Sequence, residues 1–408
     1  MNKRLTEAVI SRFRNQEGPV CAFVYDLDHL HRHVRKVMEL LPERCEMYYA
    51  MKANSERPVL ETLAPLVHGF EVASGGEIRK AREAGETIPV IFGGPGKTDE
   101  ELEKAIRMRV SLIHAESLHE LRRLAHLAQK LDGEVRVLLR VNLAGPFPAG
   151  ATLHMAGRPT AFGIDERDVP TVLEELKRFR RVRLEGFHFH SVSNHLQEET
   201  HLQVIRHYMS KAKRWAKEHG LALTRLNAGG GIGVNYRELD NQFDWATFCS
   251  GLGELIEREL PETWTLMFEC GRFLTASCGV YATEVIDLKS NHGETFAIIR
   301  GGTHHFRLPA SWQHNHPFEV VPVEKWNRPF PRKEIREEPV TVVGQLCTPK
   351  DTLARNVPVG RLRIGDLIVF QYAGAYGWAI SHHDFLSHPH PDHVWLPVER
   401  READRESV

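Results

Sequence analysis

The sequence lacks the features that would direct a chain to a membrane or to nucleic acid. Its 408 residues carry a formal net charge of −1, so there is no excess of positive charge to attract nucleic acid or anionic lipid. No apolar run approaches the roughly 18 residues of a membrane-spanning helix, and the amino-terminal segment has no apolar signal-peptide core. We therefore expect a cytoplasmic protein that has no membrane or nucleic-acid partner.

Cysteine is scarce and irregularly spaced. The six cysteines stand at positions 21, 45, 249, 270, 278 and 347. None forms a CxxC pair, which argues against a disulfide framework and against a zinc site. Histidine is abundant by contrast, with 24 residues, but the clusters at His304/His305, His314/His316, His382/His383 and His388/His390/His393 stand in loop-like sequence without the regular spacing of metal ligands. We expect no bound metal.

The first long section of the chain alternates between apolar and helical patterns. Between Leu30 and residue 275, short apolar runs are separated by segments of helical period. The apolar runs predict eight strands, which are Cys45–Ala50, His68–Val72, Pro89–Gly93, Leu112–Ala115, Arg136–Val141, Glu185–His190, Arg225–Ala228 and Thr265–Glu269. Eight repeats of strand and helix are typical of a (β/α)₈ TIM barrel, and a doubly wound sheet is the alternative.

The pattern changes after Ala276. Strand-like runs broken by glycine, proline and asparagine follow, at Val280–Leu288, Thr295–Arg300, Val340–Val343 and Leu367–Tyr372. They predict a β-sandwich or β-barrel domain over residues 276–397. Since the barrel of residues 30–275 already has eight strands, we expect residues 1–29, a helix and the run Val20–Tyr25, to join the β domain. Residues 398–408 look disordered.

Lys52 follows the first expected barrel strand. Barrel enzymes keep their reactive groups at the carboxyl ends of strands. A lysine amine in such a place can form a Schiff base with a carbonyl cofactor if burial keeps its pKa low. A lone lysine after a strand is more often a solvated surface residue, so the remaining motifs must decide its role.

Two later segments offer groups that would suit a phosphorylated ring cofactor. The glycine-rich run Asn227–Gly233 follows the seventh strand, and barrels favour phosphate binding after strands seven and eight. Arg272, just past the eighth strand, offers a second phosphate anchor. Glu269 ends that strand, and a carboxylate beside a pyridine nitrogen keeps the nitrogen protonated and the ring a strong electron sink. Glycine runs after strands also form ordinary tight turns, and a glutamate at a strand end is often a capping or salt-bridged residue. These residue types therefore do not establish a cofactor site by themselves.

His188 and His190 lie near the end of the sixth expected strand. Alternation points both side chains to one side, where one can stack on a flat cofactor ring. The same spacing binds metal in barrel hydrolases, which is the main competing interpretation as an enzyme. Those hydrolases carry the pair on the first strand, where this chain has Lys52 instead.

Taken together, these motifs resemble the fold type III decarboxylases that use pyridoxal 5′-phosphate (PLP). That family includes ornithine, arginine and diaminopimelate decarboxylases and has an alanine racemase-like fold. The motifs that carry the resemblance run in order as YYAMKANS, GFEVASGGEI, GFHFHSVS, NAGGGIG, FECGR, GQLCTPKD and YAGAYG. Within the family the chain is more similar to decarboxylases of staphyloferrin B-type siderophore biosynthesis, through MYYAMKANSER, ATLHMAGRPT and SWQHNHPF.

The resemblance implies a role for each site residue. Lys52 would hold PLP as a Schiff base, Glu269 would pair with the ring nitrogen, and His190 would stack on the ring. The other cofactor-binding residues would be Ser193, Gly229, Gly230, Gly231, Gly271, Arg272 and Tyr376. Cys347 would return a proton after CO₂ leaves. In this family that cysteine comes from the partner subunit, so the resemblance implies a homodimer with shared active sites.

Three departures from the family pattern concern the substrate. Thr348 stands where relatives usually have an acid that holds a distal ammonium group. The Arg-x-x-x-Tyr of diaminopimelate enzymes is incomplete at Arg307, and the segment Ala144–Gly163 carries His154 and Arg158 rather than acids. A buried ammonium group needs a partner. A substrate whose distal amine is acylated by citrate removes that need, and its carboxylates would meet Arg158 or Arg307.

We therefore expect a PLP-dependent decarboxylase that converts citryl-diaminopropionate to citryl-diaminoethane in siderophore biosynthesis. Diaminopimelate or another basic amino acid is the alternative substrate. Racemases of this fold place an arginine near the pyridine nitrogen, where this chain has Glu269. A non-catalytic PLP-carrier protein would lack both the β domain and the motif around Cys347.

Overall fold

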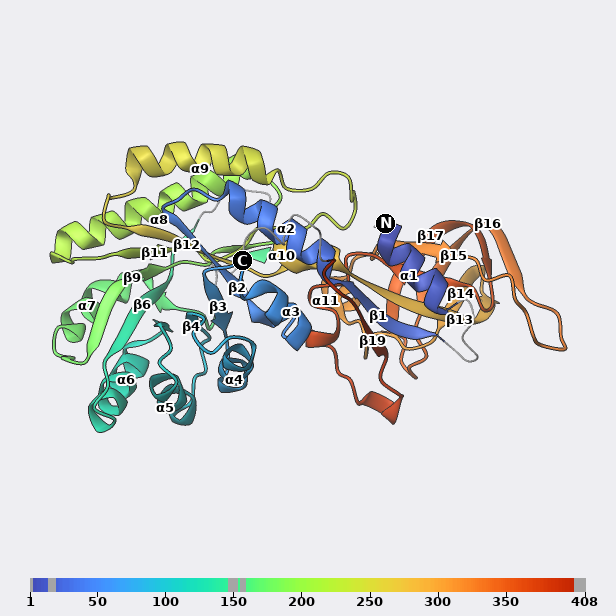
Figure 1. Cartoon of the computed structure of the whole chain (residues 1–408), viewed down its shortest axis with the longest axis horizontal. Coiled ribbons are helices and arrows are strands. Elements are labelled where there is room, and N and C mark those ends of the chain that lie inside the picture. Colours follow the sequence, from blue (N-terminus) through green and yellow to red (C-terminus); the bar gives the residue numbers. More distant parts are fainter. Residues whose placement is uncertain (1–2, 14–19, 146–152, 155–158, 400–408) are drawn as a thin grey trace. The chain divides into compact units, whose positions relative to one another are not determined.

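The computed structural model describes residues 3–13, 20–145, 153–154 and 159–399. Two compact units make up the chain (Figure 1). The barrel unit comprises His33–Asn235 and Asp240–Leu274, and the β unit comprises Met1–Arg32, Tyr236–Leu239 and Thr275–Val408. Residues 400–408 of the expected tail lie outside the described residues.

Eight parallel strands close the barrel unit into a ring. In order around the ring they are β2 (Cys45–Ala50), β3 (Gly69–Val72), β4 (Val90–Phe92), β5 (Leu112–Ala115), β6 (Val135–Asn142), β9 (Val182–His188), β11 (Arg225–Asn227) and β12 (Thr265–Cys270). Strand β12 pairs with β2, and β5 pairs with β6, so the ring has no open edge. The predicted (β/α)₈ barrel is confirmed, and the doubly wound alternative is wrong.

Helices follow the strands and lie around the outside of the ring (Figure 1). They are α3 (Arg57–Leu63), α4 (Gly75–Ala84), α5 (Asp99–Arg107), α6 (Leu118–Lys130), α7 (Val169–Leu176), α8 (Glu198–His219), α9 (Trp245–Glu259) and the short α10 (Arg272–Thr275), with α2 (Leu27–Leu40) before β2. Side-chain caps fix several starts; Thr98 and Glu101 form a capping box at α5. No helix in the described part of the chain is long and apolar enough to cross a membrane.

The barrel interior is filled by side chains from several strands. Five residues form one buried cluster: Tyr48, Ile91, Leu112, Leu138 and Met267. They come from β2, β4, β5, β6 and β12, which lie on different sides of the ring. The interior is thus a packed core, as in other barrels of this type, and space for chemistry lies beyond the strand ends.

The β unit is built on a mixed sheet. Its strands are β1 (Cys21–Asp26), β13 (Gly279–Asn291), β14 (Glu294–Ile299), β15 (Phe318–Val321), β16 (Glu334–Val343), β17 (Thr352–Arg363), β18 (Leu367–Phe370) and β19 (Asp392–Leu396). The main path runs β15-β18-β13-β14-β16-β17, and β1 lies between β13, which it meets antiparallel, and β19, which it meets in parallel. Helix α1 (Lys3–Phe13) covers this sheet, because its Leu5, Val9 and Phe13 join a buried cluster with β1, β13 and β18.

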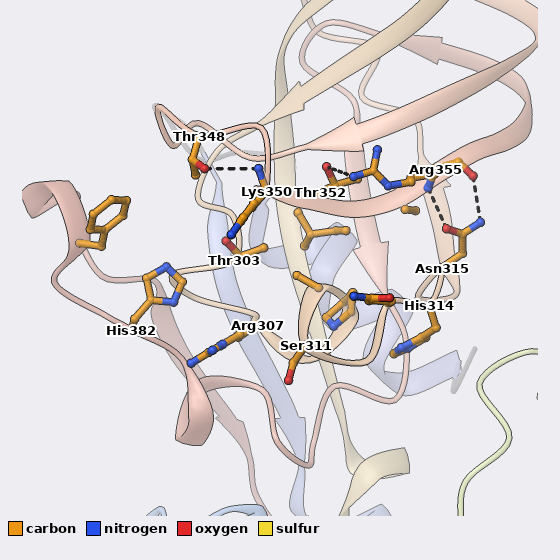
Figure 2. Close-up of a pocket in the computed structure, with 16 residues that line it drawn as sticks. Thr303, Arg307, Ser311, His314, Asn315, Thr348, Lys350, Thr352, Arg355 and His382 are labelled. Carbon is orange, nitrogen blue, oxygen red and sulfur yellow. Dashed lines mark hydrogen bonds between the residues drawn. The ribbon is translucent and has the colours of Figure 1, made fainter. Parts of the chain in front are cut away.

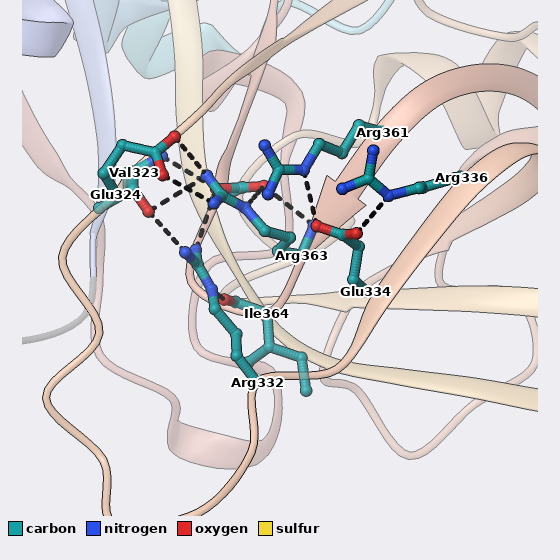
Figure 3. Close-up of polar contacts among 9 residues, drawn as sticks. Val323, Glu324, Arg332, Glu334, Arg336, Arg361, Arg363 and Ile364 are labelled. Carbon is teal, nitrogen blue, oxygen red and sulfur yellow. Dashed lines mark hydrogen bonds and ion pairs between the residues drawn. The ribbon is translucent and has the colours of Figure 1, made fainter.

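Ion pairs fasten the loop after β15 to the turn between β17 and β18 (Figure 3). Arg363 donates to both carboxylate oxygens of Glu324 at 2.9 Å and to the buried Asp366. Arg332 donates to Asp366 at 3.0 Å and to the Val323 carbonyl at 2.7 Å. Because each arginine also bonds backbone or a buried acid, the network orders a loop that has no strand of its own.

Candidate active site

Lys52 lies at the end of β2, in a short 3₁₀ turn (Met51–Ala53). Its Nζ donates to Oε2 of Glu71 on β3 at 3.0 Å. The lysine side chain is 44% exposed, whereas that of Glu71 is buried. Burial raises the pKa of Glu71, and the charge of Lys52 opposes this rise. The amine is therefore held at the barrel mouth, open to a small molecule.

Glu269, on β12, is surrounded by polar groups from three other strands. Asn227 of β11 donates from Nδ2 to Oε1 of Glu269 at 2.7 Å. His114 of β5 places Nδ1 at 3.5 Å from the same oxygen, and His188 of β9 places Nε2 at 3.4 Å from Oε2. The Glu269 side chain is only 3% exposed. The ring of strands thus fixes one carboxylate in a buried polar pocket.

The two histidines beside Glu269 stack on each other. Their ring centroids are 4.1 Å apart, and the planes are inclined at 29°. Burial lowers the pKa of both well below the usual value, so both are neutral at pH 7. Neither nitrogen of His188 has a hydrogen-bond partner among the described residues. Unsatisfied buried nitrogens are rare and point to a bound group nearby.

Among the described residues, His114, His188 and Glu269 also place one potential metal-ligand atom each within 4.8 Å of one another. Three buried donors at this spacing would suit an ion as well as an organic cofactor. The expectation that no metal binds therefore stays a prediction.

The glycine run after β11 approaches His190 very closely. The Gly230 amide donates to Nδ1 of His190 at 3.2 Å, which leaves the proton of the neutral ring on Nε2. A Cβ on Gly229, whose φ is +68°, would lie 2.5 Å from Nδ1 of His190. A Cβ on Gly230 would lie 2.3 Å from the Glu269 carbonyl oxygen. The glycines bring bare backbone beside both the histidine and the glutamate.

One feature of His190 differs from expectation. Strand β9 ends at His188, so His190 lies in the loop that follows and not on the predicted strand Glu185–His190. The ring centroids of His188 and His190 are 6.4 Å apart. The predicted strand is therefore two residues too long, and the Gly230 hydrogen bond holds His190 beyond its end. That both side chains point to one side stays a prediction.

Gly271 and Arg272 connect β12 to the Lys52 turn. A Cβ on Gly271 would lie 2.8 Å from the Ala53 Cβ and 3.0 Å from the Ala50 carbonyl oxygen. Arg272 begins α10 and is nearly buried. Ser193 lies on a two-residue strand, β10 (Val192–Ser193), after β9. Lys52, His190, Gly229–Gly231, Glu269 and Gly271 are thus brought to one end of the barrel.

Of the two predicted substrate residues of the barrel unit, the structure describes the backbone of one. The backbone of His154, in β7 (Leu153–His154), pairs with Val192 and so lies beside the Ser193 strand. Arg158 lies outside the described residues. Their proposed contacts with substrate stay predictions.

The other predicted site residues belong to the β unit. Cys347 is exposed and unpaired in the loop between β16 and β17, and Thr348 follows it. Arg307 and Thr348 line the same cavity of that unit. Tyr376 has a φ of +53°, an unusual value for a residue with a side chain. Such local strain is often found at ligand sites.

Several polar residues of the barrel had no predicted role. Glu71, His114 and Asn227 contact the predicted residues directly. Arg140 donates to Glu116 at 2.9 Å, at the same end of the neighbouring strands. Glu71 and Asn227 stand inside the motifs GFEVASGGEI and NAGGGIG, next to the end of a strand. That position could have indicated that they belong to the site. His114 gave none, since it reads as one residue of a buried strand.

Comparison with known proteins places these features in a family. The model of the pyridoxal-dependent decarboxylases, pyridoxal binding domain, matches residues 27–276. Over 393 residues the chain is 52% identical to 2-[(L-alanin-3-ylcarbamoyl)methyl]-2-hydroxybutanedioate decarboxylase of Staphylococcus aureus, which spans 96% of this chain and 98% of that protein. It is 32% identical over 378 residues to L-glutamyl-[BtrI acyl-carrier protein] decarboxylase of Niallia circulans, which spans 90% and 87%.

Solved structures agree with this placement. Diaminopimelate decarboxylase of Helicobacter pylori, complexed with L-lysine, superposes with a TM-score of 0.81 at 26% identity. The match covers 96% of this chain and 94% of that one.

The barrel residues also fit the cofactor of this family. A pyridine nitrogen needs a buried carboxylate, and Glu269 supplies one. A phosphate needs a close approach to backbone and a cation, and the glycine run Gly229–Gly231 and the buried Arg272 after β12 offer both at this end of the barrel. The aldehyde needs an accessible amine at the barrel mouth, where Lys52 lies. The chain belongs to the pyridoxal-dependent decarboxylases, and its cofactor is PLP.

Proposed function

We propose that this enzyme decarboxylates citryl-diaminopropionate, an L-amino acid whose side-chain nitrogen is joined by an amide bond to citrate, and so makes a citryl-diaminoethane precursor of a siderophore. The name of the Staphylococcus aureus relative describes that substrate, and its identity of 52% extends over nearly the whole of both chains. The observation that carries the proposal is the cavity that Arg307 and Thr348 line, because no acidic side chain lines it among the described residues. A free distal ammonium group would have no counter-ion there.

A second relative supports a conjugated substrate. The Niallia circulans enzyme acts, by its name, on a glutamyl group attached to an acyl-carrier protein. Both relatives therefore take an amino acid that is part of a larger conjugate. Thr348 in place of the usual acid fits this class better than a free diamine.

In this proposal the site residues of the barrel, together with Tyr376 of the β unit, hold the cofactor. The Lys52 amine would hold the cofactor aldehyde, Glu269 would pair with the ring nitrogen, and His190 would stack on the ring. Ser193, Gly229–Gly231, Gly271, Arg272 and Tyr376 bind the phosphate end. When bound, PLP accepts the electron pair that departing CO₂ leaves behind. Asn227 would keep Glu269 in place through its hydrogen bond, and the buried rings of His114 and His188 lie beside the carboxylate.

Cys347 completes the proposed site as the acid that returns a proton to the α-carbon. Its thiol is exposed and in the β unit, where another group can reach it. We propose that it serves the active site of a partner copy in a homodimer, as the family resemblance implies. The six unpaired cysteines suit a reducing compartment, and we place the reaction in the cytoplasm.

Diaminopimelate or another basic amino acid is the alternative substrate, favoured by the similarity to the Helicobacter pylori enzyme. A CO₂-release assay separates the two proposals. We expect kcat/KM for citryl-diaminopropionate to exceed that for meso-diaminopimelate, ornithine and lysine. Since an arginine–carboxylate contact contributes about 1.5–3 kcal/mol, Arg307→Ala and Arg158→Ala should each raise KM for the conjugate roughly ten- to hundredfold. A preference for a free diamine would overturn the substrate assignment and leave the decarboxylase chemistry intact.

A further inference from the structure

The β unit contains a cavity of about 870 Å³ (Figure 2). Three segments of the unit line it: the α11 region around Leu308–Trp312, the Thr348–Arg355 stretch that leads into β17, and the loop after Tyr376. Its volume lies within the range of small-molecule sites, about 300–1,000 Å³. A ligand of moderate size therefore fits.

The charged residues that line the cavity are all cationic. Its cationic residues are Arg307, Lys350 and Arg355, and it also has two histidines, His314 and His382. No aspartate or glutamate lines the cavity among the described residues. An acid-free cavity with several cations attracts an anion with more than one negative charge.

Nothing within the described structure neutralises these cations. The side chains of Arg307 and Lys350 make no hydrogen bond or ion pair with a described residue. Arg355 donates only to a neutral hydroxyl, Thr352 Oγ1, at 3.2 Å. The nearest acid in sequence, Asp351, is buried and accepts from the backbone amides of Thr303 and Leu346 at 2.6 and 2.9 Å.

The cations sit on fixed backbone. The Asn315 side chain accepts from the Arg355 amide at 2.8 Å and donates to the Arg355 carbonyl at 2.9 Å, which clamps that residue at the edge of the cavity (Figure 2). The Arg307 amide donates to Ser381 Oγ at 3.0 Å, and that hydroxyl donates to the His305 carbonyl at 2.9 Å. A preformed arrangement of charges lowers the cost of ordering them around a ligand.

We propose that this cavity binds the polycarboxylate end of the substrate, with Lys350 and Arg355 as carboxylate ligands in addition to Arg307. This inference rests on the proposed function. A citryl group joined through one amide keeps two carboxylates and a hydroxyl, so it offers two negative charges to the three cations. Asn315 and Thr352 hold Arg355 in place, and Lys350 supplies a point charge that needs no fixed geometry.

Citrate serves as the probe, because it carries the proposed group and undergoes no reaction. Calorimetric titration of citrate into the whole PLP-loaded enzyme should show binding, and Lys350→Gln or Arg355→Gln should weaken it roughly tenfold each. Lys350→Arg should keep most of the affinity. The matched controls Lys325→Gln and Arg336→Gln remove exposed cations of the same unit that do not line the cavity, and they should leave citrate binding unchanged.

Kinetics with citryl-diaminopropionate separate this proposal from the proposed function. We expect KM to rise with citrate Kd in the two cavity variants while kcat changes less than about twofold, a pattern of lost uniform binding. If wild-type enzyme binds citrate through Lys350 and Arg355 but does not decarboxylate the conjugate, the function fails and the cavity assignment stands. If it decarboxylates the conjugate and neither substitution changes KM or citrate Kd, or if wild type binds no citrate, the cavity assignment is overturned.

Discussion

Asn227 and Glu269 lie on neighbouring barrel strands and share a hydrogen bond of 2.7 Å between Nδ2 and Oε1. Asn227 also accepts from the Gly229 amide at 2.8 Å through Oδ1. One amide side chain therefore connects the proposed ring-nitrogen carboxylate with the proposed phosphate loop.

Removal of this amide should weaken cofactor binding and catalysis together. A hydrogen bond to a charged group contributes about 1.5–3 kcal/mol, so Asn227→Ala should lower kcat and the affinity of apoenzyme for PLP by roughly tenfold or more. Fluorescence titration with PLP measures the affinity. Asn194→Ala is the matched control, because Asn194 bonds Val234 rather than Glu269. Equal affinity in Asn227→Ala and wild type would contradict the proposed link.

Lys52 should be the lysine that carries the cofactor. Borohydride reduction of the loaded enzyme followed by peptide mapping should place the label on Lys52, and Lys52→Ala should show neither label nor activity. Lys97 is the informative comparison, since its amine is buried in an ion pair with Glu120 at 2.7 Å and is closed to a ligand. A label on any other lysine would remove the site assignment.

The shared active site can be tested by mixing two inactive proteins. Lys52→Ala and Cys347→Ala subunits, brought together under exchange conditions, should regain activity because half of the dimers are hybrids with one intact site. Random pairing predicts recovery to about a quarter of the wild-type level for a symmetric dimer. Mixing Lys52→Ala with the double variant should restore nothing. Absence of recovery after demonstrated exchange would mean that each site is made by one chain.

His201 should make the barrel sensitive to mild acid. It is buried against Phe243 and Phe248, and burial lowers its pKa to about 3. The unfolded chain takes up a proton near pH 6.5 and the folded chain does not, so stability falls as pH drops from 6.5 toward 3. One such histidine lowers the unfolding free energy by about 1.4 kcal/mol per pH unit in that window.

The test measures the free energy of unfolding in urea at pH 7 and at pH 5 for wild type and two variants. His201→Leu should lose about 2 kcal/mol less than wild type over this interval. His126→Leu, at an exposed position, should behave as wild type does. Parallel losses in all three proteins would show that His201 does not contribute.

The sequence predicted the barrel well because most of its strands are short, buried and largely apolar runs. Strand β17 was missed, since TLARNVPVGRLR contains asparagine, proline and glycine and looks like a loop. Its pairing with β16 overrides these local signals. Tertiary contacts, rather than local propensity, determine such a strand.

Within the site, individual residues were easier to predict than their partners. Glu269 and the glycines stand in recognisable motifs, whereas His114 meets Glu269 only because β5 and β12 face each other across a closed ring. The cationic cavity could not be read from the sequence either. Arg307 is far along the chain from Lys350 and Arg355, and only the folded β unit gathers all three in a cavity that no acid lines among the described residues.

The position of β1 affects how the chain folds as it is synthesised. This amino-terminal strand forms its antiparallel pair with β13 and its parallel pair with β19, where Ala22 meets Asp392. At a translation rate of about 5–20 residues per second, the strand emerges tens of seconds before its last partner. The barrel segments and β13 are synthesised in the meantime, so the edge of β1 that meets β19 is the last one to gain its partner. That interval is when a chaperone would matter most for this protein, since an uncovered strand edge pairs readily with other chains.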